Sequence, residues 1–257
     1  MVTDTEQYLF DLNGYYIVKG ALTPEQVVGL NALIDRERLD GPGNQHENIT
    51  AFHKVLLQDH HELRDLIDNP RILPYLHKWV ARPAVSKGSY PPRLDMTYFI
   101  FADKGTLGGD LHLGGTPYVP ACSYHVEGGD IFSALTVVSY ALSESAPPGL
   151  GGFACIPGSH KSKFPCPAQY ANLSDLSCVA CPSVEPGDAI IFTEALTHGT
   201  LPWKAEHQRR VLFYKYSPMH MAFMHPRWSE RLLEICSPEQ REMLRSPQMM
   251  DSPDYFS

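Results

Sequence analysis

The stretch PGDAIIFTEALTHGTLPWKAEHQRRVLFYKYS, residues 186–217, contains two runs that are rich in β-branched and aromatic side chains. These runs are Asp188–Thr193, which follows a Pro-Gly pair, and Arg210–Tyr216. Short runs of this composition, bounded by Gly and Pro, are typical of β-strands. Residues 186–217 therefore predict two strands, with His198 between them and Arg209 at the start of the second.

Runs of the same kind occupy much of the chain from residue 94 onward. Further strands are predicted at Met96–Ala102, Phe132–Leu142 and Phe153–Ile156, with weaker candidates near 110–113 and 178–181. Regular short strands with Gly and Pro turns favour a sandwich or barrel over a parallel α/β sheet. The predicted fold class is an all-β core with helical additions (α+β).

The first 80 residues have mainly helical patterns. Thr23-Pro24-Glu25-Gln26 is a capping box with proline at the first helical position, and the apolar stripe after it predicts a helix of about 15 residues. Shorter helices are predicted at 61–67 and 71–80, and a strand at 14–18. We expect a single domain over 1–257, with a helical part at 1–93, a β core at 94–225, and a C-terminal part at 226–257 with a helix near 228–235 and then irregular structure.

The charge of the chain limits the class of partner. A formal net charge of -8 argues against a nucleic-acid or anionic-membrane surface, because both favour basic patches, and so favours a small-molecule substrate. No apolar run approaches the roughly 20 residues that span a bilayer, and the start MVTDTEQYLF lacks the basic and apolar regions of a signal peptide. We therefore expect a cytoplasmic protein.

Six cysteines in a chain of this length do not suggest a disulfide framework, so free buried thiols are expected. Cys178-Val-Ala-Cys181 has CxxC spacing, but no second ligand pair for zinc lies nearby in the sequence. We interpret this segment as strand packing.

Three segments together resemble the phytanoyl-CoA dioxygenase-like branch of the iron(II)/2-oxoglutarate oxygenases. They are NGYYIVKGALTPE at 13–25, GGFACIPGSHK at 151–161, and PGDAIIF at 186–192 with THGT at 197–200 and RR at 209–210. The resemblance covers about 200 residues and implies a double-stranded β-helix, or jelly roll, flanked by helices. Iron(II) and 2-oxoglutarate would lie between its two sheets and react with O2. In the Pro-Gly-Ser-His turn of the second segment, His160 would be structural.

The resemblance also implies roles for individual residues. His198 matches the distal metal histidine, and Arg209, eleven residues later, matches the arginine that pairs with the far carboxylate of 2-oxoglutarate. A planar guanidinium suits this task because it pairs bidentately with carboxylates. Thr200 would share the strand face of His198 and could bond the same carboxylate. Arg210 would then point away, to solvent or a salt bridge.

The proximal half of the metal site is open. In these oxygenases a His-x-Asp or His-x-Glu pair completes a two-histidine, one-carboxylate site. The family spacing leads to His112, but Gly114 stands two residues later and cannot coordinate. The alternatives are Asp110 acting with His112, or His125-Val126-Glu127, which is itself a His-x-Glu pair.

With glycine at position 114, the metal motif resembles that of the iron/2-oxoglutarate halogenases, in which chloride occupies the place of the carboxylate. Removing aspartate takes away one negative charge and opens one coordination site, and a halide restores both. The leading hypothesis is radical halogenation of an unactivated C–H bond of a small molecule. The alternatives are a hydroxylase that uses Glu127 or Asp110, and a metal-free binding or regulatory protein on a degenerate oxygenase fold.

Overall fold

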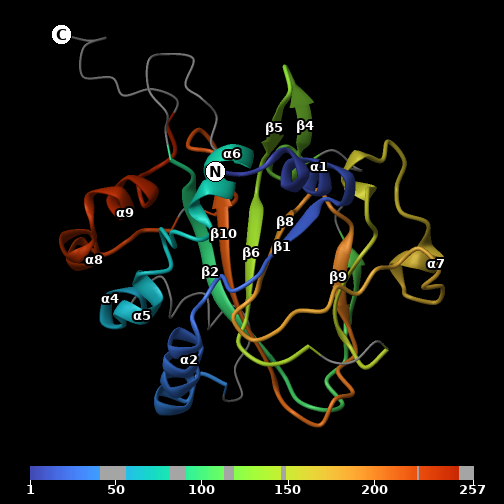
Figure 1. Cartoon of the computed structure of the whole chain (residues 1–257), viewed down its shortest axis with the longest axis horizontal. Helices are drawn as coiled ribbons and strands as arrows, with labels where there is room; N and C mark the ends of the chain where they lie inside the picture. The colour runs from blue at the N-terminus through green and yellow to red at the C-terminus, as the bar shows by residue number, and fades with distance from the viewer. Residues whose placement is uncertain (41–55, 81–90, 113–118, 146–148, 225, 249–257) are drawn as a thin grey trace.

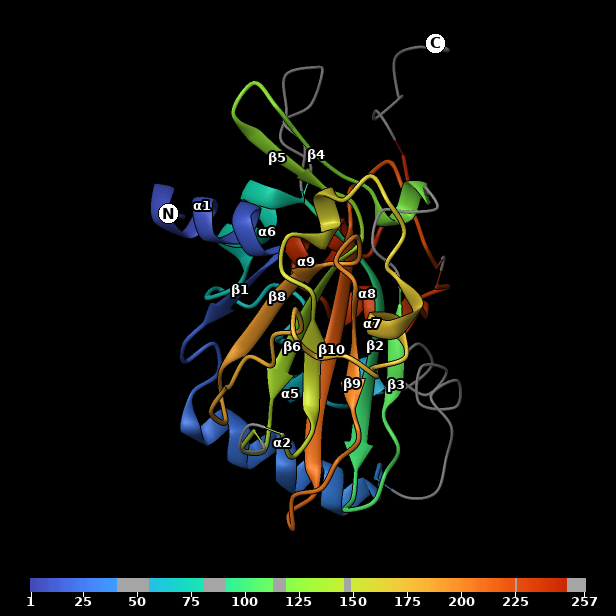
Figure 2. The same ribbon diagram turned by 90° about the vertical axis from the view of Figure 1, so that its right-hand side faces the viewer.

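A computed structural model describes residues 1–40, 56–80, 91–112, 119–145, 149–224 and 226–248. Two antiparallel sheets face each other at its centre (Figures 1 and 2). The larger sheet has the strand order β1-β8-β6-β10-β2, and the smaller has the order β3-β9-β7. This arrangement is the expected double-stranded β-helix with helical additions.

The large sheet contains the longest strands. Its strands are β1 Tyr15–Val18, β8 Ala189–Thr193, β6 Thr136–Ala141, β10 Arg209–Ser217 and β2 Arg93–Ala102. β10 lies between β6 and β2 and pairs with both, with a register shift near Lys215. Both strands predicted from residues 186–217 are therefore confirmed, as neighbours of β6 in one sheet.

The small sheet consists of β3 Gly109–His112, β9 His198–Leu201 and β7 Gly152–Cys155. A separate hairpin, β4 Tyr124–Glu127 and β5 Asp130–Ser133, forms its own two-stranded sheet and extends beyond the end of the large one (Figure 2). The predicted strand 132–142 is therefore two strands, because the chain turns at Ala134-Leu135 and begins a new pairing.

Alternation along the strands gives the large sheet two different faces. The face toward the small sheet is lined by Met96, Tyr98, Val137, Ile190, Phe192, Val211 and Phe213. The opposite face, which includes Val138, Tyr140, Leu212, Tyr214 and Tyr216, belongs to the main core that the helices complete. Two layers of apolar side chains thus hold the large sheet from both sides.

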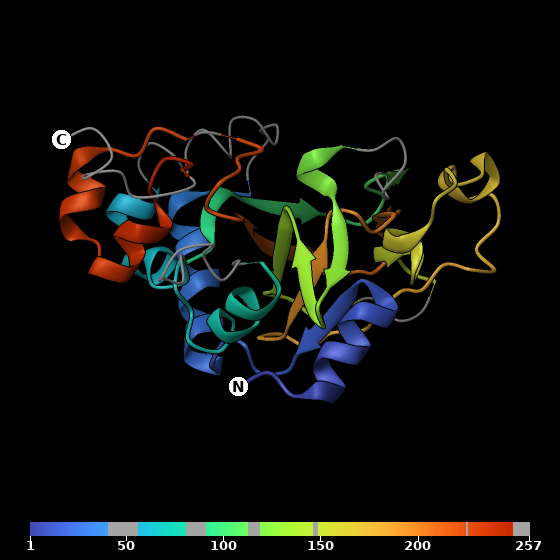
Figure 3. The same cartoon turned by 90° about the horizontal axis from the view of Figure 1, so that it is seen from above.

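Helices cover the outer face of the large sheet (Figures 1 and 3). They are α1 Asp4–Asn13, α2 Pro24–Glu37, α4 Leu57–Asp59, α5 His61–Arg64, α6 Leu73–Trp79, α8 Glu230–Ile235 and α9 Pro238–Met243. The short helix α7 Ala168–Ala171 lies on the far side of the small sheet, and 3-10 turns occur at Pro120–Cys122 and Ser159–Lys161. In the described residues no helix is long and apolar enough to cross a bilayer.

Several predictions about elements need correction. The capping box at Thr23 begins α2 as predicted, but α1 and α9 were not predicted as helices. Residues 178–181 form no strand, only a single bridge between Cys155 and Ala180. Cys178 and Cys181 are exposed, so interpreting this segment as strand packing was wrong. All six cysteines are free, as predicted, but only Cys122, Cys155 and Cys236 are buried.

Candidate functional site

His112 and His198 lie opposite each other on neighbouring strands of the small sheet. β3 pairs with β9 so that the two residues are direct partners, and their ring centroids are 4.6 Å apart. The sequence separates them by 86 positions, yet the register places both rings together. This is the pair that the sequence predicted as metal ligands.

Each ring is oriented by a backbone carbonyl two residues earlier in the chain. Nδ1 of His112 lies 3.0 Å from the oxygen of Asp110, and Nδ1 of His198 lies 2.7 Å from the oxygen of Leu196. A carbonyl only accepts, so each Nδ1 carries a hydrogen, and the neutral form of either ring has its lone pair on Nε2. Metal-bound histidines commonly have this arrangement, with one nitrogen on a carbonyl and the other on the metal.

His198 is neutral in the fold. Its ring is buried between Phe192 and Phe153, at centroid distances of 4.7 and 6.2 Å. Burial lowers the pKa of His198 to about 4, against a smaller opposing effect of Glu194. At neutral pH the ring is therefore a lone-pair donor, as a metal ligand must be.

A buried carboxylate lies beside this histidine. Glu194 is 2% exposed, and its Oε2 is 3.9 Å from Nε2 of His198. Its Oε1 accepts a hydrogen bond of 2.5 Å from Nζ of Lys215. Burial opposes ionisation of Glu194, but attraction to the charged Lys215 outweighs burial and lowers the carboxyl pKa.

Lys215 is charged as well, since Glu194 and Tyr98 outweigh the effect of burial and raise its pKa to about 12. Tyr98 stacks on Phe213 with ring centroids 5.0 Å apart, and the Lys215 ammonium lies 5.6 Å from the Tyr98 ring centre. Residues 209, 211, 213 and 215 alternate along β10 and share its inner face. The strand therefore presents Arg209 and Lys215 to the space between the sheets.

Arg209 has a buried and incompletely paired guanidinium. The residue is 5% exposed, and within the described part of the chain its Nη1 has no hydrogen-bond partner. Burial lowers its pKa to about 10, although the nearby Tyr98 opposes this effect. A buried guanidinium that is still charged at neutral pH and lacks a partner favours an anionic ligand.

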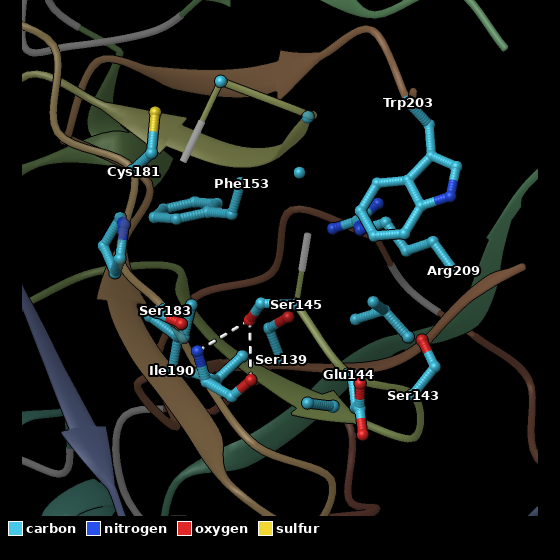
Figure 4. Close-up of a pocket in the computed structure, with 17 residues that line it drawn as sticks. Ser139, Ser143, Glu144, Ser145, Phe153, Cys181, Ser183, Ile190, Trp203 and Arg209 are labelled. Atoms are coloured by element: carbon cyan, nitrogen blue, oxygen red, sulfur yellow. Dashed lines mark hydrogen bonds between the residues drawn. The ribbon is translucent and has the colours of Figure 1, made fainter. Parts of the chain in front are cut away.

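A pocket lies next to this guanidinium. Figure 4 shows Arg209 beside Trp203 on one side and Phe153 on the other. Besides Arg209, the polar residues that line the pocket include Ser139, Ser143, Glu144, Ser145 and Ser183. Phe153 lines this pocket and also packs near His198, so a single aromatic side chain links the pocket to the histidine pair. The neighbouring Arg210 points outward as predicted, to Asp35 at 2.8 Å and Asp40 at 3.2 Å.

These residues fit iron and 2-oxoglutarate. The two Nε2 lone pairs suit a metal ion, and the Arg209 guanidinium, whose Nη1 has no partner among the described residues, suits the far carboxylate of a dicarboxylate. Among the described residues, however, no three His, Cys, Asp or Glu side chains are close enough to enclose a metal by themselves. A third protein ligand would need a rearrangement or a residue outside the described ranges.

The remaining predicted residues have different surroundings. Gly114 lies outside the described residues. Asp110 is exposed and contributes its backbone carbonyl to His112. Thr200 follows His198 along β9 and is partly buried. The structure describes no contact between its hydroxyl and Arg209.

His125 and Glu127 lie on the hairpin strand β4. The His125 ring stacks on Phe132, and Glu127 is exposed opposite Asp130 near the turn. Sheet pairing thus brings His112, and not His125, to His198. His160 is buried and its Nε2 lies 2.9 Å from the carbonyl of Asp11, which fits the structural role expected of it.

Sequence analysis missed Glu194 and Lys215. A signal was present, because Ile190 and Phe192 alternate toward the interior and Glu194 continues that series. A charged residue at an inward position is rarely buried without a partner. The partner is Lys215, 21 residues later, and pairing at that distance in sequence was not apparent before the strands were placed.

Comparison with known proteins gives a family and a fold. A family profile described as phytanoyl-CoA dioxygenase (PhyH) matches residues 10–211. HygX from Streptomyces hygroscopicus, solved with nickel and 2-oxoglutarate bound, is similar with a TM-score of 0.72 and 20% identity over 86% of this chain and 89% of that one. The epimerase SnoN, solved with Fe3+, alpha ketoglutarate and nogalamycin RO, is similar with a TM-score of 0.59 and 15% identity over 84% of each chain. A comparison with curated proteins finds no match. At these identities the solved structures show a shared fold.

Proposed function

Because the chain belongs to the phytanoyl-CoA dioxygenase family, we propose that it is an iron(II)- and 2-oxoglutarate-dependent oxidoreductase that acts on a C–H bond of a small molecule. The observation that carries this proposal is the placement of Arg209 in a pocket that Phe153 links to the His112–His198 pair. Sites of this chemistry use two histidines and one anionic ligand on iron(II), and here the histidine pair and the anchor for 2-oxoglutarate are the parts that the described residues provide.

Each residue has one task in this proposal. His112 and His198 hold iron(II) through Nε2, and Arg209 pairs with the far carboxylate of 2-oxoglutarate. When bound, the metal and 2-oxoglutarate together reduce O2, with release of CO2, and supply the oxidising power that breaks the substrate C–H bond. Phe153 and Phe192 keep water from the buried side of His198.

The exposure of the two histidines gives a direction of approach. His112 is exposed, whereas His198 and Arg209 are buried. The cosubstrate therefore occupies the closed end of the site and the substrate enters from the side of His112. HygX has been solved with hygromycin B bound, and SnoN with nogalamycin RO, so proteins of this fold bind small molecules. We propose a small-molecule substrate here too.

The outcome of the oxidation depends on the anion at the third metal position. His112-Leu113-Gly114 favours halogenation, because glycine leaves this position to chloride. The buried carboxylate of Glu194 beside His198 favours the second candidate, a halide-independent oxidation such as hydroxylation. We place the second candidate first, because a carboxylate already present in the site meets the same demand for charge.

An anaerobic titration of the protein with iron(II) and 2-oxoglutarate tests the shared part of the proposal. Formation of the weak visible charge-transfer band of their chelate is the expected result. Absence of both the band and any thermal stabilisation by the pair would instead support a metal-free binding protein. Once a substrate is found, comparing product formation with and without chloride and bromide distinguishes halogenation from halide-independent oxidation.

A further inference from the structure

The carboxylate of Glu194 has two oxygens in different surroundings. Oε1 is used by Lys215 at 2.5 Å, and Oε2 is directed to Nε2 of His198 at 3.9 Å. The separation of 3.9 Å is too long for a hydrogen bond. Glu194 therefore has one oxygen that neutralises a lysine and one that is available to another group.

The atom that Oε2 faces is itself a lone-pair donor. His198 carries its hydrogen on Nδ1, which bonds the carbonyl of Leu196 at 2.7 Å, so Nε2 of the neutral ring cannot donate. Two lone-pair donors that face each other in a buried site repel, unless a cation or a hydrogen-bond donor lies between them. The ring of His112, the sheet partner of His198, lies beside this histidine, with the two ring centroids 4.6 Å apart.

The ion pair with Lys215 has no evident role in stability. The side chains of Lys215 and Glu194 are 12% and 3% exposed, and a buried ion pair seldom stabilises a protein more than apolar residues would. The lysine keeps the carboxylate ionised and fixes Oε1. Such an arrangement is suited to holding the second oxygen of an ionised carboxylate in a fixed position beside His198.

We propose that Glu194 supplies the anionic protein ligand of the metal site, in place of a carboxylate at position 114, and that Lys215 holds it there. This inference rests on the proposed function, because it takes His112 and His198 as the other two ligands. Neighbouring ligands of one metal lie about 3 Å apart, so Oε2 must move by about 1 Å when the metal binds. A small rotation about the side-chain torsions of Glu194 provides that movement while Oε1 stays on Lys215.

The ligand set would then come from both sheets. The two histidines lie on the small sheet, and Glu194 follows the last residue of β8 in the large sheet. The anionic ligand at the third metal position would then be part of the protein, so no halide is needed to balance the charge of the metal. The inference therefore predicts a metal site that excludes chloride despite the glycine at 114.

The test compares metal affinity of the whole protein in three forms. Wild type, Glu194→Gln and Glu127→Gln are titrated anaerobically with iron(II), and separately with cobalt(II), whose visible spectrum reports on its coordination. Gln at 194 keeps the shape and removes the charge, and Glu127 is an exposed carboxylate of the alternative His-x-Glu pair. We expect Glu194→Gln to weaken binding at least about 10-fold and change the cobalt spectrum, and Glu127→Gln to match wild type.

The outcomes separate the inference from the proposed function. If wild type binds neither metal, the proposed function fails. If wild type binds and Glu194→Gln binds equally well with the same cobalt spectrum, the proposed function stands and the role of Glu194 is wrong. A structure of the wild-type protein with manganese(II) decides the matter without any variant, even if Glu194→Gln fails to fold. Oε2 at about 2.2 Å from the metal supports the inference, and a metal bound without Glu194 overturns it.

Discussion

His112 and His198 are direct partners across the β3–β9 pairing, and each ring is held by the carbonyl two residues before it in the chain. The same hydrogen bond on two facing strands leaves Nε2 of each ring as the nitrogen that can bind a metal. We propose that the pair is a preformed half of a metal site, which other groups complete.

His112→Ala and His198→Ala should each reduce iron(II) affinity by about 100-fold or more, because each removes one of two strong ligands. His125→Ala is the matched control and should leave the affinity unchanged. Anaerobic equilibrium dialysis measures all three, with circular dichroism to confirm that each variant is folded. Loss of binding in His125→Ala together with normal binding in His112→Ala would move the proximal ligand to the hairpin.

Gly14→Ala should destabilise the protein far more than Gly20→Ala. Both glycines have positive φ, 78° and 59°, so both variants lose about 1–2 kcal/mol to backbone strain. A Cβ on Gly14 would also meet Nδ1 of His160 at 2.6 Å, whereas none of the described atoms lies within 4 Å of one on Gly20. The overlap adds about 1–3 kcal/mol. Urea unfolding of both variants measures the difference, and equal destabilisation would contradict the packing seen at His160.

Stability should fall as the pH is lowered below neutrality. Burial lowers the pKa of His160 to about 4 from an ordinary value of 6.5, and His198 shifts in the same direction. The unfolded chain therefore takes up protons first, and stability present above about pH 6.5 is lost as the pH falls toward 4. For His160 alone the loss between pH 7.5 and 5 is about 2 kcal/mol.

Urea unfolding of the metal-free protein at these two pH values measures the effect of protonation. His160→Gln should keep a donor for the Asp11 carbonyl but remove the titrating ring, so its loss should be smaller by about 2 kcal/mol. The same pH dependence in wild type and His160→Gln would show that His160 does not titrate below its ordinary range.

Much of the fold was predictable because its signals are local. Apolar runs and Pro-Gly turns identified β8 and β10, and the capping box at Thr23 identified the start of α2. An equivalent capping box at Thr3 begins α1, so that helix was also within reach of the same rule. The break at Ala134-Leu135 was not predictable from the sequence. Both halves of the run 132–142 have strand composition, and only their pairing partners separate them.

The residues of the site also fall into two groups, those that a sequence motif identifies and those that only the fold brings together. His112, His198 and Arg209 were identified because the motif spacing includes them. Glu194 and Lys215 belong to no motif, and they pair because strands β8 and β10 both flank β6. The halogenation hypothesis followed from the glycine at 114 alone, before a carboxylate from the other sheet was visible beside His198.

We propose that Arg209 anchors 2-oxoglutarate beside the two histidines, and the neighbouring Arg210 provides a matched control. The measurement is the affinity for 2-oxoglutarate in the presence of iron(II), followed anaerobically through the charge-transfer band, in wild type, Arg209→Met and Arg210→Met. Arg209 is buried and its Nη1 has no partner in the part of the chain that the structure describes, whereas Arg210 already pairs with Asp35 and Asp40. Loss of a charge-assisted pair worth about 2–3 kcal/mol should weaken binding by about 30- to 150-fold in Arg209→Met. Arg210→Met should bind like wild type. Normal 2-oxoglutarate binding by Arg209→Met, or an equal loss in both variants, would contradict the account.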